Sequence, residues 1–386
     1  MRGTHQREQP GSNGSAVARL LSRWDRLDHP LRHLPRAAAI LVAVLLMAAM
    51  GWTIGAATPV DQAEKDWVAA TSDGSGGDLA LYQRMAERVI AGEDYYPAVM
   101  EEHRARDYPV RPFVAVRPPT LAMLHGFIGV DGARYVALAL LLACGFLVYL
   151  RLEHRVGMAE RIAAMVMLVL GGAATFMPQS GLIHELFAGL LLSLALLLYR
   201  PERWWPSLLL AGFALAVREL STAFVMLWLV FALADRRWRE VAALSGSLVL
   251  FAIGMMLHAR GIAVLLQPGD PPSPGWSAMQ GYGLPVLALL RLSGLALLPL
   301  ALAAPLTLLP LFGWIGLGGR FGLFATLWFI GLFTIMALFA RVDNFYWAQM
   351  VLPAYAAGFA FAPRALADLA YAVIGRRKGA LNQTLP

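Results

Sequence analysis

The residues best suited to chemistry in this chain are one early carboxylate and a series of arginines beside apolar runs. Asp78 follows Gly76-Gly77 and opens a segment with helical spacing. A positioned carboxylate can take the proton of an attacking hydroxyl, and the planar fork of arginine binds two phosphate oxygens. These residue types therefore predict a site for a hydroxyl and a phosphate. The arginines expected near one membrane surface are Arg111, Arg117, Arg134, Arg218, Arg260, Arg291 and Arg341.

Each of these residues also has a purely structural explanation. Asp78 could cap the helix that follows it. A single arginine could lie at the membrane interface or form a local ion pair. As a group, the arginines favour a phosphate role over these explanations, with Arg117 and Arg218 as the first choices.

Further polar residues interrupt the apolar part of the chain. His184-Glu185 continues as Leu-Phe-Ala, so the second histidine of a His-Glu-x-x-His zinc site is missing and a zinc hydrolase is not supported. Glu185 and Glu219 are candidate second acids, either to hold an arginine or to assist a metal. The adjacent residues Arg218 and Glu219 would not share one face of a helix, so we do not expect them to pair. No protein metal site is assigned; a divalent cation, Mg²⁺ or Mn²⁺, is left open.

The amino-acid composition indicates that the elements holding these residues are membrane helices. Hydrophobic residues make up 58% of the 386 positions and charged residues only 15%, whereas soluble domains have about a quarter charged. Apolar runs recur at close to the roughly 20 residues needed to cross a bilayer. A soluble globular domain is therefore excluded. The single cysteine, Cys144, excludes an internal disulfide and a cysteine-based metal site.

Charge asymmetry then predicts the topology of an all-α, multi-pass protein of a bacterial inner membrane. Residues 1–36 are rich in arginine and are expected to form a disordered cytoplasmic arm. Residues 58–132 hold twelve of the 25 acidic residues and are expected to be a large periplasmic loop. Thr120 to Val130 is too short to cross and is expected to be re-entrant or interfacial. This choice places the later arginine clusters in the cytoplasm, and it explains the net charge of +7 without nucleic acid.

About ten transmembrane helices result, with a second periplasmic loop at 258–283 and a cytoplasmic tail at 363–386. The transmembrane domain is expected over 37–362. The ten spans are 37–57, 133–150, 162–177, 182–199, 205–217, 220–234, 240–258, 294–316, 321–340 and 346–362.

The first loop contains an amphipathic segment. Tyr82, Met85, Ala86, Val89 and Ile90 recur at helical spacing, which predicts a helix that ends near Gly92 and lies on the membrane surface. In the last outer turn, Tyr346 and Arg341 are expected to contact sugar or lipid phosphate, and Trp347 is interpreted as an interfacial aromatic residue.

The motif Gly77-Asp78-x-x-x-Tyr82-x-x-x-Ala86, followed by Gly92-x-x-Tyr95-Tyr96 and Arg117-Pro118-Pro119, resembles the first outer loop of the GT-C glycosyltransferases. It is most similar to the mannosyltransferase-like family 87, with the aminoarabinose and protein mannosyltransferases as more distant relatives. The resemblance covers roughly residues 37–235 by pattern.

This resemblance implies an enzyme that moves a sugar from a polyprenyl-phosphate donor to a lipid or glycan acceptor on the periplasmic face. It puts Asp78 at the position of the catalytic base, with membrane lipids around it and no nucleic acid as a partner. The other site residues are then Glu185 and Glu219 as acids, and Arg117, Arg218, Arg341, Arg111, Arg134, Tyr82, Tyr346 and His184 as donor-phosphate or substrate contacts.

Two other classes of membrane protein remain open. A polysaccharide polymerase or ligase of the cell envelope also uses lipid-linked sugars, but a large loop directly after the first span favours the GT-C interpretation. A transporter of lipid-linked substrates would commonly show internal repeats, and no repeat is apparent in the sequence.

Overall fold

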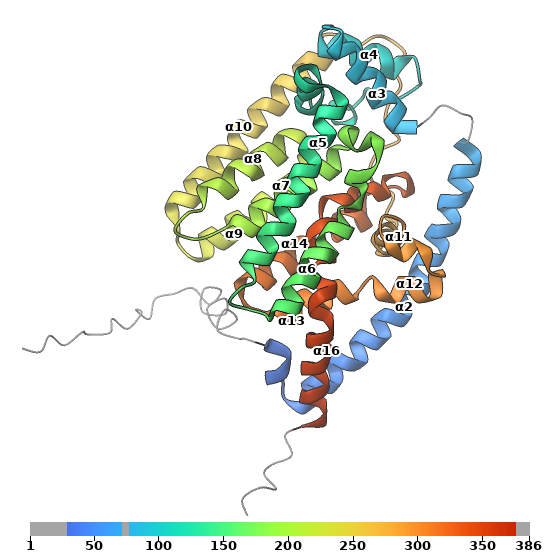
Figure 1. The fold of residues 1–386 in the computed structure, drawn as a ribbon. Coiled ribbons are helices and arrows are strands. Elements are labelled where there is room, and N and C mark those ends of the chain that lie inside the picture. Colours follow the sequence, from blue (N-terminus) through green and yellow to red (C-terminus); the bar gives the residue numbers. More distant parts are fainter. Residues whose placement is uncertain (1–28, 72–76, 376–386) are drawn as a thin grey trace, which may run out of the picture.

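The computed structural model describes residues 29–71 and 77–375, and in these ranges every regular element is a helix (Figure 1). Six of the helical segments are long and apolar enough to cross a membrane. The protein is therefore an all-α membrane protein. These segments are Arg36–Ala69, Phe113–Arg151, Trp238–Ala263, Leu300–Leu317, Gly319–Phe339 and Leu352–Ile374.

The outer helices present apolar side chains outward. The longest, α2 (Arg36–Thr71), runs along the outside of the bundle and exposes Leu41, Leu45, Met47 and Trp52 (Figure 1). On the other side of the bundle, α10 (Trp238–Ala263) exposes Val249 and Leu250. Apolar surface of this extent is stable only against lipid or protein, which fits a membrane environment.

The centre of the bundle is α7 (His184–Leu198), in which every residue from His184 to Leu197 is buried. Its 15 residues extend about 22 Å, less than the roughly 30 Å of the hydrocarbon layer. Protein surrounds the helix, so polar residues at its N-terminus can find protein partners below the membrane surface. The other central helices are α5 (Thr120–Arg151), α6 (Met158–Gly171), α8 (Trp205–Val217), α9 (Thr222–Ala234) and α14 (Gly319–Phe339), with the 3₁₀ turns η3 (Ala173–Phe176), η4 (Pro178–Leu182) and η5 (Glu219–Ser221).

A break in α5 separates the short apolar stretch Thr120 to Val130 from the rest of the helix. Gly129 has φ 74° and ψ 173°, a left-handed conformation that glycine adopts without strain from a Cβ. The short first limb is thus a separate piece of helix, and the long second limb covers residues 133–150, which were expected to form the second span.

The first loop folds on the protein at one end of the bundle (Figure 1). The predicted amphipathic helix is confirmed as α3 (Gly77–Ile90). Its buried residues Leu81 and Met85 join a small core with Val99 and Met100 of α4 (Tyr95–Arg104). The helix therefore packs on other protein segments, including α5, instead of lying free on a membrane surface. The 3₁₀ turn η2 (Phe113–Ala115) follows.

The C-terminal third differs from the predicted spans because prolines divide it. The stretch expected as one span over 294–316 consists of η6 (Gly294–Leu297), α12 (Leu300–Leu306) and α13 (Leu309–Leu317). It follows α11 (Gly283–Arg291). The expected span 346–362 consists of η7 (Val342–Met350), α15 (Leu352–Ala356) and the start of α16. Pro353 and Pro310 both stand in the first turn of a new helix, where a missing N–H is tolerated.

The two terminal regions meet within the described residues. The chain enters through η1 (Pro30–His33), and α16 (Gly358–Ile374) continues past Pro363 into the region expected to be a tail. His29 Nδ1 lies 2.6 Å from a carboxylate oxygen of Asp368. The expected disordered arm falls on residues 1–28, and the rest of the tail on 376–386, both outside the described residues.

The contact between α13 and α16 gives a stability prediction. A Cβ built on Gly313 would overlap the carbonyl oxygen of Gly358. We expect Gly313→Ala to destabilise the fold by about 1–3 kcal/mol, because the two backbones must separate. The thiol of Cys144, the single cysteine, is fully buried and can report thermal unfolding through a thiol-reactive dye.

Gly51→Ala is the matched control, since a Cβ on Gly51 in α2 meets no atom within 4 Å. Equal unfolding midpoints for the two variants would contradict this account of the helix contact.

Candidate active site at the N-terminus of α7

The candidate site forms where segments distant in the sequence meet at the N-terminus of α7. Glu185 lies in the first turn of α7, and Arg218 ends α8. Arg117 precedes α5 and Tyr346 lies in η7, while Asp78 and Tyr82 come from α3. Contacts between these side chains connect the first loop to the centre of the bundle.

Glu185 holds two buried arginines. Its Oε1 lies 2.7 Å from Nε of Arg218 and 3.3 Å from Nη2 of Arg117. The side chains of Glu185 and Arg218 are each 2% exposed and that of Arg117 is 10% exposed. The first turn of a helix favours the carboxylate and the end of a helix favours the arginine. Because an unpaired charge at this depth is costly, these ion pairs are needed to keep the three groups buried.

Arg218 also pairs with Glu219, although the sequence did not predict this contact. The two residues were not expected to pair because neighbours in a helix point in different directions. Arg218 is instead extended, with φ −148° and ψ 117°, so this restriction does not apply. The side chain of Glu219 is 24% exposed, against 2% for Glu185. Glu219 is therefore the accessible acid of the pair, and Glu185 the buried one.

Asp78 joins this cluster through a tyrosine. The Tyr346 hydroxyl donates to Oδ2 of Asp78 at 3.2 Å and accepts from Nη2 of Arg117 at 3.2 Å. Asp78 itself is only partly buried. The loop carboxylate thus stays accessible while it is coupled to the buried ion pairs.

Two further tyrosines of the loop surround these groups. The Tyr82 hydroxyl accepts from Nε of Arg117 at 3.0 Å, and burial raises the pKa of Tyr82 above its ordinary value. Burial, the charge of Asp78 and a hydrogen bond to Asp78 likewise raise the pKa of Tyr108. Both phenols therefore stay protonated at neutral pH and act as hydrogen-bonding groups.

His184 lies within the same cluster. Its ring packs edge-on against Tyr82, with centroids 5.2 Å apart. Its Nδ1 is buried and meets no hydrogen-bond partner among the described residues. His184, a candidate substrate contact from the sequence, thus lies against Tyr82 of the cluster.

Three other predicted arginines, Arg341, Arg111 and Arg134, contact partners outside the cluster. Arg341 pairs with Asp343 at 2.8 Å, near Tyr346 in sequence, and its Nη1 is buried without a hydrogen-bond partner in the described part of the chain. Arg111 donates to the carbonyl oxygen of Asp270 at 3.1 Å, in the second loop. Arg134 donates to the carbonyl oxygen of Phe176 at 3.4 Å. Arg111 and Arg134 therefore connect backbone segments.

Two aromatic residues contribute more than the sequence analysis assigned to them. Trp347 is 5% exposed and its ring lies 5.6 Å from the guanidinium carbon of Arg218, so its interpretation as an interfacial aromatic residue is wrong. The Tyr95 hydroxyl donates to the carbonyl oxygen of Arg117 at 2.5 Å. The Tyr95-Tyr96 pair was part of the sequence motif, whereas nothing in the local sequence separates a buried Trp347 from an interfacial one.

No group of three or more histidine, cysteine or acidic side chains in residues 29–71 and 77–375 is arranged to hold a metal ion. Glu185 is used by two arginines. A divalent cation, which the sequence analysis left open, is thus not assigned to these residues.

An apolar groove of about 590 Å³ lies between α8 and α10, beside the cluster. Pro118 and Pro119, which directly follow Arg117, line it, as does Ala216, two residues before Arg218. Its wall is almost entirely apolar along the helices and meets His258 and Tyr96 at the loop. The groove thus runs along the helices and ends beside residues that adjoin Arg117 and Arg218 in the chain. Along the helices it is lined by Leu208, Leu209, Gly212, Phe213, Leu215, Ser247, Leu250, Phe251, Gly254, Met255 and Leu257.

Comparison with known proteins gives no relative. No family model matches the chain, and neither curated proteins nor solved structures include a significant match.

An ion pair joins the two outer loops, and a buried histidine lies next to it in the first loop. Asp270 pairs with Nε of Arg104 at 2.7 Å, and this hydrogen bond lowers the pKa of Asp270 to about 2. The stabilisation is present above the ordinary aspartate pKa and is lost only as pH falls toward 2. Beside it, burial lowers the pKa of His103 to about 4.

We therefore expect acid to destabilise the first loop through His103. Between about pH 6.5 and pH 4 the unfolded chain binds a proton at this residue that the folded chain excludes, so stability falls as pH falls. Thermal unfolding at pH 7, 6 and 5 should show a steeper decline for the wild type than for His103→Asn. His154→Asn, at an exposed histidine, is the control. An unchanged slope in His103→Asn would exclude this explanation.

Proposed function

We propose that this protein is an integral-membrane glycosyltransferase that moves a sugar from a polyprenyl-phosphate donor to a lipid or glycan acceptor. One observation carries the proposal: an accessible carboxylate, Asp78, is hydrogen-bonded through Tyr346 to paired arginines beside an apolar groove. A base, a phosphate-binding pair and a lipid channel are the three parts that such a reaction needs.

In the proposed reaction Asp78 takes the proton of the acceptor hydroxyl. The acceptor oxygen forms a bond to the anomeric carbon as the bond from that carbon to the phosphate oxygen breaks. The leaving polyprenyl phosphate retains the bonding electrons. Tyr346 positions the carboxylate of Asp78, and its other contact, Arg117, faces the developing charge of the phosphate.

The arginines start neutralised, because Glu185 and Glu219 balance Arg117 and Arg218. Phosphate must therefore displace a carboxylate to gain an arginine. Glu219 is the one displaced, since its side chain is 24% exposed and it pairs with one arginine, whereas Glu185 is 2% exposed and holds two. Arg341, with its unpartnered Nη1, is a further phosphate contact in this proposal.

We place the site on the periplasmic side of a bacterial inner membrane, with about ten spans and both termini in the cytoplasm. The support is the distribution of arginines and acids along the chain. Asp94→Cys gives a direct test because Asp94 is exposed and the native Cys144 is buried. A membrane-impermeant maleimide should label it in intact spheroplasts, and labelling only after lysis would overturn the orientation.

The groove makes a separate prediction about the donor's lipid chain. Gly212 and Gly254 line it, and a Cβ on either meets no atom within 4 Å. Filling it with Gly212→Phe or Gly254→Phe should raise the KM for a long-chain donor about tenfold, the loss of roughly two buried CH₂ groups. A donor with a short isoprenoid chain should be affected much less, as measured by initial rates.

Gly246→Phe is the control, because Gly246 also has open space and does not line the groove. Equal effects on long and short donors would show that the groove does not hold the lipid chain.

The transferase activity itself is tested with purified protein in lipid vesicles. Labelled polyprenyl-phosphate hexoses and pentoses are supplied with a membrane lipid extract, and transfer of the label to a new product is followed. Nucleotide sugars and oligosaccharide-linked lipids are tested as alternative donors. If folded protein transfers no sugar from any polyprenyl-phosphate donor, the proposal is refuted.

A further inference from the structure

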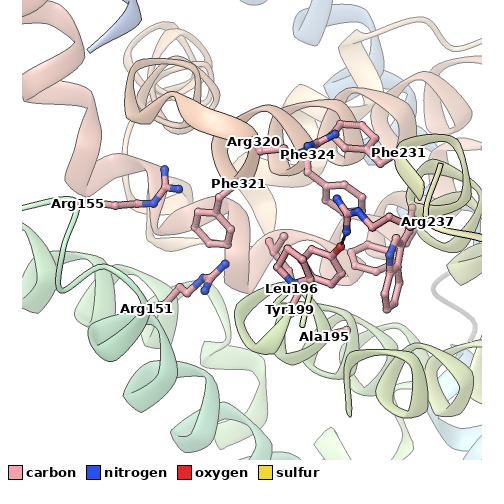
Figure 2. A pocket seen from close by; sticks show the side chains of 13 residues that line it. Arg151, Arg155, Ala195, Leu196, Tyr199, Phe231, Arg237, Arg320, Phe321 and Phe324 are labelled. Atoms are coloured by element: carbon pink, nitrogen blue, oxygen red, sulfur yellow. Dashed lines mark hydrogen bonds between the residues drawn. The ribbon is translucent and has the colours of Figure 1, made fainter. Parts of the chain in front are cut away.

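A second pocket lies at the opposite end of α7 from the candidate active site. It has a volume of about 220 Å³ and forms where α5, α7 and α9 end and where α10 and α14 begin (Figure 2). The 15 residues of α7 separate the two sites by about 22 Å. This pocket is therefore independent of the proposed donor site.

Four arginines line this pocket, namely Arg151, Arg155, Arg237 and Arg320. Arg237 pairs with Asp235 and Glu240, and Arg320 also pairs with Asp235. Together, the four arginines and these two carboxylates carry a net charge of +2. The excess makes the pocket attractive to an anion.

The positive charge that no paired carboxylate balances lies on Arg151 and Arg155. Within the described residues, neither has a carboxylate at salt-bridge distance, in contrast to Arg237 and Arg320. Nε of Arg151 is buried without a hydrogen-bond partner in those residues. Figure 2 shows both side chains on one side of Phe321, with Arg237 on the other. Two guanidinium groups that are not neutralised by a carboxylate of the described residues provide the paired N–H donors that bind phosphate oxygens.

The rest of the lining is aromatic. Tyr199, Phe224, Trp228, Phe231, Phe321 and Phe324 form most of its wall. Arg151 lies over one of these rings, with its guanidinium carbon 5.4 Å from the centroid of Phe321. A free phosphate ion would leave this apolar surface uncovered, whereas a phosphate attached to an acyl chain covers it. The pocket also lies where the apolar helices end, at the level of lipid headgroups.

We propose that this pocket binds the phosphate group of an anionic lipid, with Arg151 and Arg155 on the phosphate and the aromatic residues against the first part of the lipid chains. The leaflet is the one on the arginine-rich side, opposite to the active site. The binding site is independent of whether the protein transfers sugars.

Native mass spectrometry of the purified protein with added lipid tests the proposal. Phosphatidic acid and phosphatidylglycerol should bind at least tenfold more tightly than phosphatidylcholine, which has no net charge. The double variant Arg151→Gln, Arg155→Gln should lose this preference by tenfold or more. Arg239→Gln is the control, because Arg239 is exposed on the same side and does not line the pocket.

Arg155→Glu provides a second variant that should fold normally, because Arg155 is exposed. It should abolish the preference for anionic lipids with an unchanged unfolding temperature. An unchanged preference in either variant would overturn the proposal. Complete displacement of the lipid by inorganic phosphate would also overturn it, since the pocket would then serve a soluble anion.

Discussion

Replacing Asp78 with asparagine is expected to reduce sugar transfer by about 10²- to 10⁴-fold, the usual contribution of a positioned general base. Asparagine keeps the shape of the side chain and can still accept the hydrogen bond from Tyr346. It cannot accept the proton of the acceptor hydroxyl. The defect should therefore appear in kcat, with the KM for the donor and the unfolding temperature close to those of the wild type.

Asp94→Asn is the matched control in the same loop, because Asp94 is exposed and its side chain makes no capping hydrogen bond. It should transfer sugar at the wild-type rate. A transfer rate for Asp78→Asn equal to that of Asp94→Asn would remove Asp78 as the base, and with it the main link between the loop and the reaction.

Replacing Glu185 with glutamine is expected to destabilise the folded protein by about 3–5 kcal/mol, the cost of leaving a buried charge without its partner. Glu185 is 2% exposed and is the carboxylate that Arg117 and Arg218 share. Among the described residues, its removal leaves Arg117 with the hydroxyls of Tyr82 and Tyr346 as side-chain partners. The loss should be measured as a lower midpoint of thermal unfolding, followed through the exposure of Cys144.

Glu219→Gln is the comparison, since Glu219 pairs with Arg218 alone and its side chain is partly exposed. It should cost less than Glu185→Gln. The double variant Glu185→Gln, Arg218→Gln should recover part of the loss, because one of the buried charges is then gone. If Glu219→Gln destabilises the protein as much as Glu185→Gln, the distinction between a structural and an exchangeable acid is incorrect.

The sequence by itself determined those features that depend on local pattern. Long apolar runs set the helical membrane class, and the spacing of Tyr82, Met85 and Ala86 predicted α3. Residue type also identified Asp78, Arg117, Arg218 and Glu185 as candidate site residues. These four residues lie together in the structure. The length of the apolar stretch Thr120 to Val130 set it apart from the span that follows, and α5 breaks at Gly129.

Only the tertiary structure decided which partners these residues have. Glu185 bridges Arg117 and Arg218, and Tyr346 reaches Asp78 from 268 positions away. No periodic pattern encodes such pairs, because they depend on how α3, α7 and η7 pack. The Arg218–Glu219 pair was not predicted because helical geometry was assumed where the chain is extended. Trp347 was expected at the membrane interface because of its place in an outer turn, whereas packing buries it. Local patterns fix which segments are helices, whereas the burial of charge is satisfied by side chains from whichever segments the packing brings together.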